Sequence, residues 1–157
     1  MVEMNIRKVK ESDFNQLMDL LNGIGWFTEI LSKPKDLLKG KFLNDISLCL
    51  KDDSHSLYVA EGDDNNILGY ASVHWLPYLF LDGPEGYISE LFIRSEARGK
   101  GVGRKPLETI KEEAKRRGCS RLSLLNGKNR ESYERNFYQK QGFIERDQMA
   151  NFICKLK

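Results

Sequence analysis

Residues 90–103 read ELFIRSEARGKGVG, in which a strand-like apolar segment runs directly into three glycines and several cations. A glycine-rich turn between a strand and a helix exposes backbone N–H groups, and the start of the helix adds partial positive charge. Such a turn attracts phosphate, because a glycine has no side chain to hold the anion away from the backbone. The turn therefore predicts a phosphate-binding loop, with a basic surface turn that binds nothing as the alternative.

The loop fits neither of two common nucleotide-binding patterns. Five positions after Gly99 stands Arg104, where the pattern G-x-x-x-x-G-K-[ST] requires glycine. The pattern G-x-G-x-x-G fails as well, because Arg104 or Lys105 occupies the place of its third glycine. The phosphate ligand must be identified from the rest of the chain.

Length and composition indicate one soluble domain that spans residues 1–157. The chain has 40% apolar and 31% charged residues, which is ordinary for a globular protein, and its formal net charge of +2 is too small to indicate a polyanion partner. Cys49, Cys119 and Cys154 are far apart and include no C-x-x-C pair, so we expect reduced thiols in a cytoplasmic protein and no metal site. Neither a signal peptide nor an apolar run of about 20 residues is apparent, so no membrane association is expected.

Hydrophobic periodicity predicts alternating strands and helices. Strands are expected at MNIRKV, SLYVAE, NILGYASVHWL, YISELFI, RLSLL and NFICKL, the second and third forming a hairpin across GDDNN. Helices are expected after Ser12, after Pro34, from the glycine loop to Gly118, and over ESYERNFYQKQ up to Gly142. This order predicts an α/β fold of the α+β type, with a mixed, largely antiparallel sheet and helices on both faces.

The second half of the chain resembles the GNAT superfamily of N-acyltransferases. Its strongest signature, R/Q-x-x-G-x-G/A, is matched by Arg98, Gly101 and Gly103. A second signature, an aromatic pair and a glycine near the end of a later helix, is matched by Phe137, Tyr138, Gly142 and Phe143. The resemblance covers residues 87–143 and implies a GNAT-like sheet whose central strands splay apart.

The resemblance also implies acetyl-CoA as the cosubstrate. In such proteins the glycine loop holds the pyrophosphate, and the preceding strand pairs with the pantetheine arm. Two departures are Pro106, which is tolerable only if its helix starts near Gly103, and Asn129, which lies nine rather than about seven residues before Tyr138. The residues that this resemblance places at acetyl-CoA are Leu91, Phe92, Ile93, Arg98, Gly99, Lys100, Gly101, Val102, Gly103, Arg104, Asn129, Ser132 and Tyr138.

Acetyl transfer to an amine needs a proton acceptor, an oxyanion donor and a proton for the departing thiolate. The resemblance places the Tyr138 hydroxyl near the sulfur as proton donor, with core packing as the alternative. A main-chain N–H of the splayed strand, such as that of Phe92, is the expected oxyanion donor. Glu90 alternates with Leu91 and Ile93, so it faces away from whatever buries them and is a candidate base or a structural ion-pair partner.

The acceptor site is expected in the first half of the chain. Aromatic side chains beside carboxylates suit a cationic amine, so we predict a pocket that also draws on Asp82, Glu85 and Glu90. His55 and His74 are interpreted as isolated, packed or solvated side chains. The candidate substrate residues, each with core packing as the alternative, are Trp26, Phe27, Glu29, Trp75 and Tyr78.

The sequence therefore predicts an acetyl-CoA-dependent N-acetyltransferase acting on a primary amine of a small cationic molecule or a peptide. The first alternative is a non-catalytic acyl-CoA sensor. The second is a nucleic-acid binder built on the cations around the glycine loop, although glutamates interleave with the cations of the following helix and favour a salt-bridged surface instead. We expect no nucleic-acid partner. The oligomeric state stays open between a monomer and a homodimer.

Overall fold

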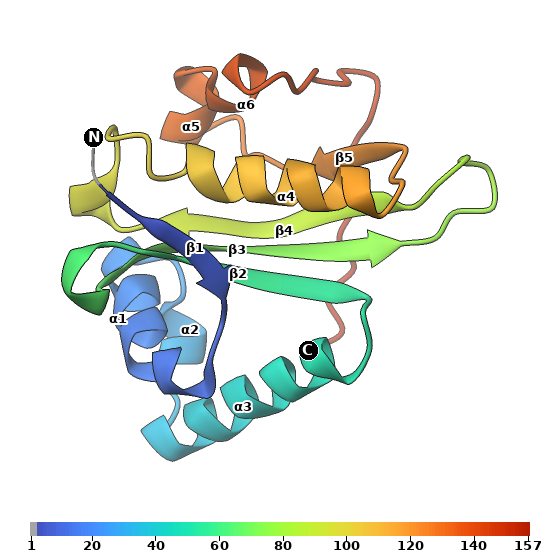
Figure 1. Ribbon diagram of the computed structural model, residues 1–157. Helices are drawn as coiled ribbons and strands as arrows, with labels where there is room; N and C mark the ends of the chain where they lie inside the picture. Colours follow the sequence, from blue (N-terminus) through green and yellow to red (C-terminus); the bar gives the residue numbers. More distant parts are fainter. Residues whose placement is uncertain (1–2) are drawn as a thin grey trace. The chain divides into compact units, whose positions relative to one another are not determined.

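The computed structural model describes residues 3–157, which form two compact units, one ending at Leu125 and the other comprising Asn126–Lys157. The first unit contains a five-stranded sheet in which spatial order follows chain order (Figure 1). Neighbouring strands are antiparallel, except that the last two are parallel. The strands are β1 (Asn5–Lys8), β2 (His55–Glu61), β3 (Ile67–Leu76), β4 (Glu85–Ile93) and β5 (Arg121–Leu124).

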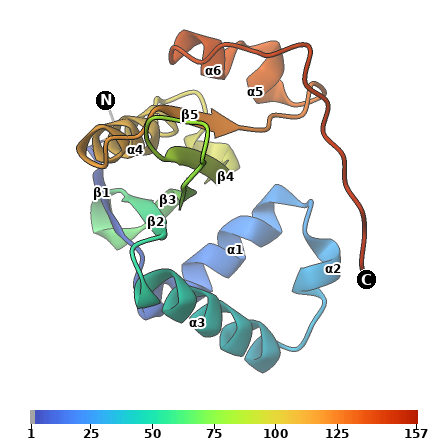
Figure 2. The ribbon, with the colours of Figure 1, turned by 90° about the vertical axis from the view of Figure 1, so that its right-hand side faces the viewer.

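Helices cover both faces of this sheet, which confirms the predicted fold class. In Figure 2, α1 (Phe14–Ile24), α2 (Thr28–Leu31) and α3 (Lys35–Lys51) lie on one side of the strands and α4 (Arg104–Arg116) on the other. Short 3-10 turns occupy η1 (Glu11–Asp13), η2 (Asp63–Asn65) and η3 (Ser95–Ala97). Among residues 3–157, no helix has both the length and the apolar character needed to span a membrane.

The helices bury the apolar stripes that their sequences predict. α1 buries Phe14, Leu17 and Leu20, and α4 buries Leu107, Ile110 and Ala114. α4 begins at Arg104, so Pro106 lies in its first turn, where a missing N–H leaves no helical hydrogen bond unmade. This start satisfies the condition that the proline imposes.

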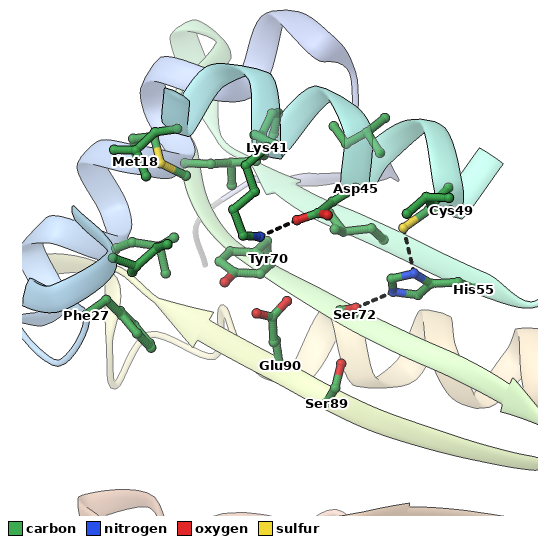
Figure 3. A pocket seen from close by; sticks show the side chains of 18 of the residues that line it. Met18, Phe27, Lys41, Asp45, Cys49, His55, Tyr70, Ser72, Ser89 and Glu90 are labelled. Atoms are coloured by element: carbon green, nitrogen blue, oxygen red, sulfur yellow. Dashed lines mark hydrogen bonds and ion pairs between the residues drawn. The ribbon is translucent and has the colours of Figure 1, made fainter. Parts of the chain in front are cut away.

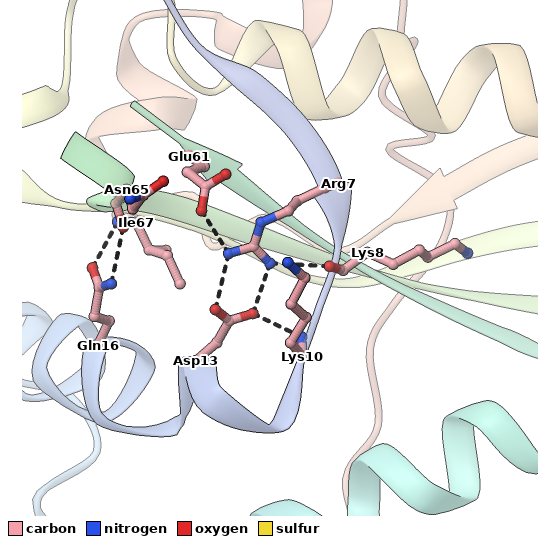
Figure 4. A network of polar contacts seen from close by, with 8 residues as sticks. All are labelled: Arg7, Lys8, Lys10, Asp13, Gln16, Glu61, Asn65 and Ile67. Carbon is pink, nitrogen blue, oxygen red and sulfur yellow. Dashed lines mark hydrogen bonds and ion pairs between the residues drawn. The ribbon is translucent and has the colours of Figure 1, made fainter. Parts of the chain in front are cut away.

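A network of ion pairs and hydrogen bonds joins β1, η1 and β2 beside α1 (Figure 4). The guanidinium of Arg7 donates to both carboxylate oxygens of Asp13, at 2.9 and 3.0 Å, and to Glu61 at 2.7 Å. Gln16 of α1 accepts from the N–H of Ile67 at 2.8 Å and donates to the carbonyl of Asn65 at 3.0 Å. These contacts fix α1 against the β2–β3 hairpin.

The second unit, residues 126–157, contains two short helices instead of one. Asn136 adopts φ 53°, which is left-handed, and divides the predicted helix into α5 (Glu131–Glu134) and α6 (Phe137–Lys140). The predicted strand at NFICKL is wrong, because residues 151–156 are irregular and Phe152 and Ile153 are exposed. Alternation in sequence does not supply the neighbouring strand that its backbone groups need.

Candidate active site

An extra residue in β4 shapes the candidate site. Ser72 of β3 lies opposite Glu90, whereas Val73 lies opposite Ile88, so the register skips Ser89. A β-bulge of this kind bends its strand and re-aims side chains. Here it allows Ser89 and Glu90, neighbours in sequence, to line the same cavity. Ile93 instead packs against the cluster of Ala60, Ala97 and Val102, so Glu90 does face away from it, as the alternation predicts.

Beyond the bulge, β4 has one open edge. The β4–β5 ladder runs from Glu85 opposite Arg121 to Ile88 opposite Leu124. From Ser89 to Ile93, the described pairing of β4 is with β3 alone. Alternate backbone N–H and C=O groups of that segment therefore point toward the open edge, where an extended ligand or an oxyanion can accept hydrogen bonds. Arg94 donates from its backbone N–H to the carbonyl of Leu68 directly opposite, so by alternation the backbone groups of Phe92 also face β3. Leu91 and Ile93 therefore present their backbone groups at the open edge, and the N–H of Phe92, the predicted oxyanion donor, does not.

A cavity of about 710 Å³ lies between the sheet and the helices α1, α2 and α3. Its size is within the range of about 300–1,000 Å³ that is typical of small-molecule sites. The sheet contributes mainly polar side chains and the helices mainly apolar ones (Figure 3). On the sheet side the polar lining residues are His55, Tyr70, Ser72, His74, Ser89 and Glu90.

Glu90 lines the cavity, with its carboxyl in a largely buried position. Burial, opposed by Lys41 and Tyr70, raises the pKa of its carboxyl above the ordinary value, so the carboxylate is a stronger base than one in water. Figure 3 shows the Tyr70 hydroxyl on the same side of the sheet as this carboxylate. Burial and the charge of Glu90 raise the pKa of Tyr70, so its phenol stays protonated. Lys41 is itself paired with Asp45 on α3.

His55 and His74, which were interpreted from the sequence as isolated side chains, both line the cavity and contact each other. His55 and His74 are opposite each other on β2 and β3, and their rings stack with centroids 4.1 Å apart. Burial raises the pKa of Cys49, so its thiol stays protonated, and its sulfur lies 2.6 Å from Nδ1 of His55. Nε2 of His55 is hydrogen-bonded to the Ser72 hydroxyl. Nε2 of His74 lies 2.9 Å from the Ser89 hydroxyl.

The glycine loop has the geometry of an open cradle. Gly99 and Gly101 adopt φ values of 74° and 80°, which favour glycine, and a Cβ built on either residue meets no atom within 4 Å. The buried side chain of Val102 anchors the loop, and Arg98 donates to the carbonyl of Ile93 at 3.1 Å. The loop thus leads from the open edge of β4 to the N-terminus of α4, and these residues fit a phosphate-bearing ligand.

The predicted substrate residues do not gather at the cavity. Phe27 lines it, and Trp26 packs on Phe27 and is 50% exposed. Glu29 is exposed on α2 and is not among the lining residues. Trp75 is buried outside this cavity, where its Nε1 donates to the Ser56 hydroxyl at 3.1 Å. The guanidinium of Arg117, the residue after α4, lies over its ring.

The predicted acidic and aromatic pocket is therefore corrected. Tyr78 contacts Phe80 in the loop after β3, and Asp82 lies in the same loop. Glu85 is buried at the start of β4, where Arg121 pairs with it and Ser123 donates to it. Of the four carboxylates expected together, Glu90 alone is among the lining residues of the described cavity. The other polar residues on the sheet side of the cavity were not predicted, because strand register decides which side chains lie next to Glu90.

The second unit holds the other predicted residues. Tyr138 of α6 packs against Phe137 and Phe143, with centroids 5.0 and 5.8 Å away, and burial raises its pKa to about 12. Its hydroxyl therefore stays protonated at neutral pH. Ser132 donates to Asn126 at 3.0 Å, and Asn129 is exposed before α5.

The sheet with helices on both faces is the fold of acetyltransferases of known structure. Residues 24–143 match the Acetyltransferase (GNAT) family, and the chain belongs to that family. This confirms the resemblance seen in the loop and in the aromatic signature. Members of the family use acetyl-CoA.

Individual relatives are distant but cover most of the chain. Thialysine N-epsilon-acetyltransferase of Mus musculus is 24% identical over 131 residues, 79% of this chain and 75% of the relative. The crystal structure of a transcriptional regulator from Bacillus halodurans C-125 superposes with a TM-score of 0.83 and 25% identity, covering 98% of this chain and 100% of the other. Glucosamine-6-phosphate N-acetyltransferase of Arabidopsis thaliana has a TM-score of 0.75 and 24% identity, covering 97% and 99%.

Proposed function

We propose that the protein transfers the acetyl group of acetyl-CoA to a primary amine bound in the cavity between the sheet and α1–α3. The position of Glu90 carries this proposal. Its carboxyl, with a raised pKa, lines the cavity on the strand whose open edge leads into the glycine loop. A proton acceptor for the amine thus lies on the same strand that offers backbone groups to the acyl donor.

The chemistry needs three groups of this chain. The Glu90 carboxylate takes a proton from the amine, directly or through water, as the nitrogen attacks the thioester carbonyl carbon. A backbone N–H on the open edge of β4, such as that of Leu91, donates to the developing oxyanion. The carbon–sulfur bond then breaks, and Tyr138 donates its proton to the departing thiolate. The products are an acetamide and the free thiol of CoA.

Backbone amides of residues 98–104 are the proposed partners of the pyrophosphate. The positive φ values of Gly99 and Gly101 and the open space at both residues support this assignment. Arg98 and Lys100 supply countercharge from exposed positions, so charge-assisted hydrogen bonds of about 1.5–3 kcal/mol each are available.

An amine acceptor agrees with the names of the relatives. The Mus musculus relative is named as an acetyltransferase of thialysine and the Arabidopsis thaliana relative as one of glucosamine-6-phosphate. The cavity volume of about 710 Å³ is of the size that small-molecule sites have, which supports a small molecule as the acceptor.

Two alternatives receive less support. The name of the Bacillus halodurans relative, a transcriptional regulator, agrees with a non-catalytic acyl-CoA sensor, but such a sensor has no need of a buried base in a second cavity. A nucleic-acid binder would need free cations. Four of the cations on and after α4 are held in ion pairs, namely Arg104 with Glu108, Lys115 with Glu112, and Arg116 and Arg117 with Glu113.

The experiment that tests the proposal is a thiol-release assay with acetyl-CoA and a panel of primary amines. We expect amine-dependent release of CoA and a mass gain of one acetyl group on the amine. Binding of acetyl-CoA without turnover on any amine would favour the sensor.

A further inference from the structure

The lining of the cavity points to one kind of amine, an inference that rests on the proposed function. We propose that the acceptor is a primary amine with an apolar body and no second charged group, such as an alkylamine or arylalkylamine. The juxtaposition that carries it is a polar sheet face bearing Glu90 against an apolar face formed by three helices (Figure 3).

The charged side chains that line the cavity have the net charge of one carboxylate. Lys41 and Asp45 pair with each other one helical turn apart on α3, and their side chains are 57% and 50% exposed. Their charges cancel, which leaves Glu90 as the net charge of the described lining. One carboxylate suits one ammonium group. A second ammonium, a carboxylate or a phosphate on the substrate would have to leave water without a dedicated partner.

The other polar side chains on the sheet face are neutral. Burial, followed by the charge of His74, lowers the pKa of His55 to about 4, and burial lowers that of His74. Both rings are therefore uncharged at neutral pH, and Tyr70, Ser72 and Ser89 can offer only neutral hydrogen bonds. This end of the cavity can orient an amine and receive its proton but cannot bind an anion by charge.

The helical face is built for an apolar body. Its apolar side chains come from α1, α2, α3 and the segment between the first two, and they include Met18, Leu21, Phe27, Leu31, Leu38 and Phe42. A methylene group buried against such a surface contributes about 0.8 kcal/mol. Each methylene added to an alkylamine should therefore raise affinity by up to about fourfold, until the cavity is filled.

Three probes of equal chain length separate the possibilities: hexylamine, 1,6-diaminohexane and 6-aminohexanoate. Each has the same reacting amine, and they differ only in the far end. We expect hexylamine to have the highest kcat/KM and the lowest Kd by calorimetry, each by about tenfold or more. A diamine or amino acid that performs equally well or better would overturn the proposal.

A variant of the helical face provides the second arm. Leu48 lines the cavity and is 56% exposed, so Leu48→Asp should fold while adding a carboxylate. It should shift the ratio of specificity constants toward 1,6-diaminohexane by about tenfold. Leu50→Asp is the matched control, because Leu50 lies on the same helix, is 68% exposed and is not among the lining residues.

Calorimetry separates this inference from the proposed function. Selective binding of hexylamine without acetyl transfer would leave the inference standing and reject the transferase. Transfer to all three probes at equal rates would support the transferase and reject the inference about the substrate. Failure of hexylamine to bind would overturn the inference.

Discussion

The imidazole rings of His55 and His74 stack on the sheet, with centroids 4.1 Å apart and planes inclined by 12°. Burial, then the proximity of His74, lowers the pKa of His55 to about 4, while burial lowers the pKa of His74. The stack therefore tolerates neutral rings and opposes protonation, which would place two like charges face to face.

Acid should destabilise the fold through this pair. Histidine in an unfolded chain titrates near pH 6.5, so the unfolded state binds protons first and stability falls between about pH 6.5 and 4. His74→Phe keeps a stacked ring and removes one titrating group, so it should lose less stability between pH 7 and pH 5 than the parent. Denaturant unfolding at both pH values measures this difference, and equal losses in the two proteins would refute the prediction.

Glu90→Gln should lower kcat/KM by about 10²–10⁴-fold, because it removes the proposed base and keeps the shape of the side chain. The rate of the parent should rise with pH through the raised pKa of Glu90, as its carboxylate forms, and this part of the profile should be lost in the variant. Steady-state rates across pH with one amine test both effects. Glu29→Gln, an exposed change outside the cavity lining, should behave like the parent. Unchanged activity of Glu90→Gln would exclude Glu90 as the base.

Gly101→Glu should abolish the rise in Tm that acetyl-CoA produces. The residue has φ 80°, and the new side chain would bring strain and negative charge into the proposed phosphate cradle. Thermal unfolding with and without acetyl-CoA is the measurement. Gly40→Glu on α3 makes the same chemical change where a Cβ meets nothing within 4 Å, and it should keep the shift. A parent-like shift in Gly101→Glu would contradict the phosphate assignment.

Tyr138→Phe should lower turnover by about 10²–10⁴-fold while leaving the affinity for acetyl-CoA nearly unchanged. The change removes a hydroxyl and retains the ring that packs on Phe137 and Phe143. Single-turnover kinetics isolate the chemical step. Tyr133→Phe, which loses a hydrogen bond to Glu145 in the same unit, is the matched control. An unaltered chemical step would assign Tyr138 to packing alone.

Asp13→Asn should destabilise the fold by about 1.5–3 kcal/mol, because it weakens charged hydrogen bonds that Arg7 makes at a buried position. Although burial opposes ionisation, Arg7 holds the pKa of Asp13 below its ordinary value. The stabilisation is thus present above the unfolded pKa of about 3.9 and is lost as the pH falls through the folded value. Denaturant unfolding measures it. Glu112→Gln, at an exposed pair, should change stability by less than about 1 kcal/mol.

Periodicity was enough to predict the five strands of the sheet and the helices α1, α3 and α4, whereas the short helix α2 was not predicted. The glycine loop and the aromatic signature together carried the resemblance to the family. The helix starts at Pro34 and after the loop depend on local chemistry, so single residues encode them. The break at Asn136 was missed, because a left-handed asparagine is only modestly signalled by its sequence. The same limit applies to NFICKL, whose alternation does not show whether a neighbouring strand exists.

The histidine pair shows why the cavity could not be derived. Counting back from the Gly62–Asn66 turn along a regular ladder would place His55 opposite Val73. The register shift between Ala60 and Glu61 moves its partner to His74 instead. A register shift of one residue moves a side chain to the other face of the sheet. The two bulges, which the sequence pattern does not reveal, therefore decide which polar groups share the cavity.

The bulge at Ser89 has a consequence for how such a site is encoded. Removing that residue would leave a regular ladder, with Glu90 still opposite Ser72 and Ile88 still opposite Val73. Side-chain identities and facings would survive, and the local bend of β4 would not. The bulge lies beside the point where β4 parts from β5, just past Ile88 and Leu124. The length of β4 is thus as much a part of the candidate site as the chemistry of its side chains.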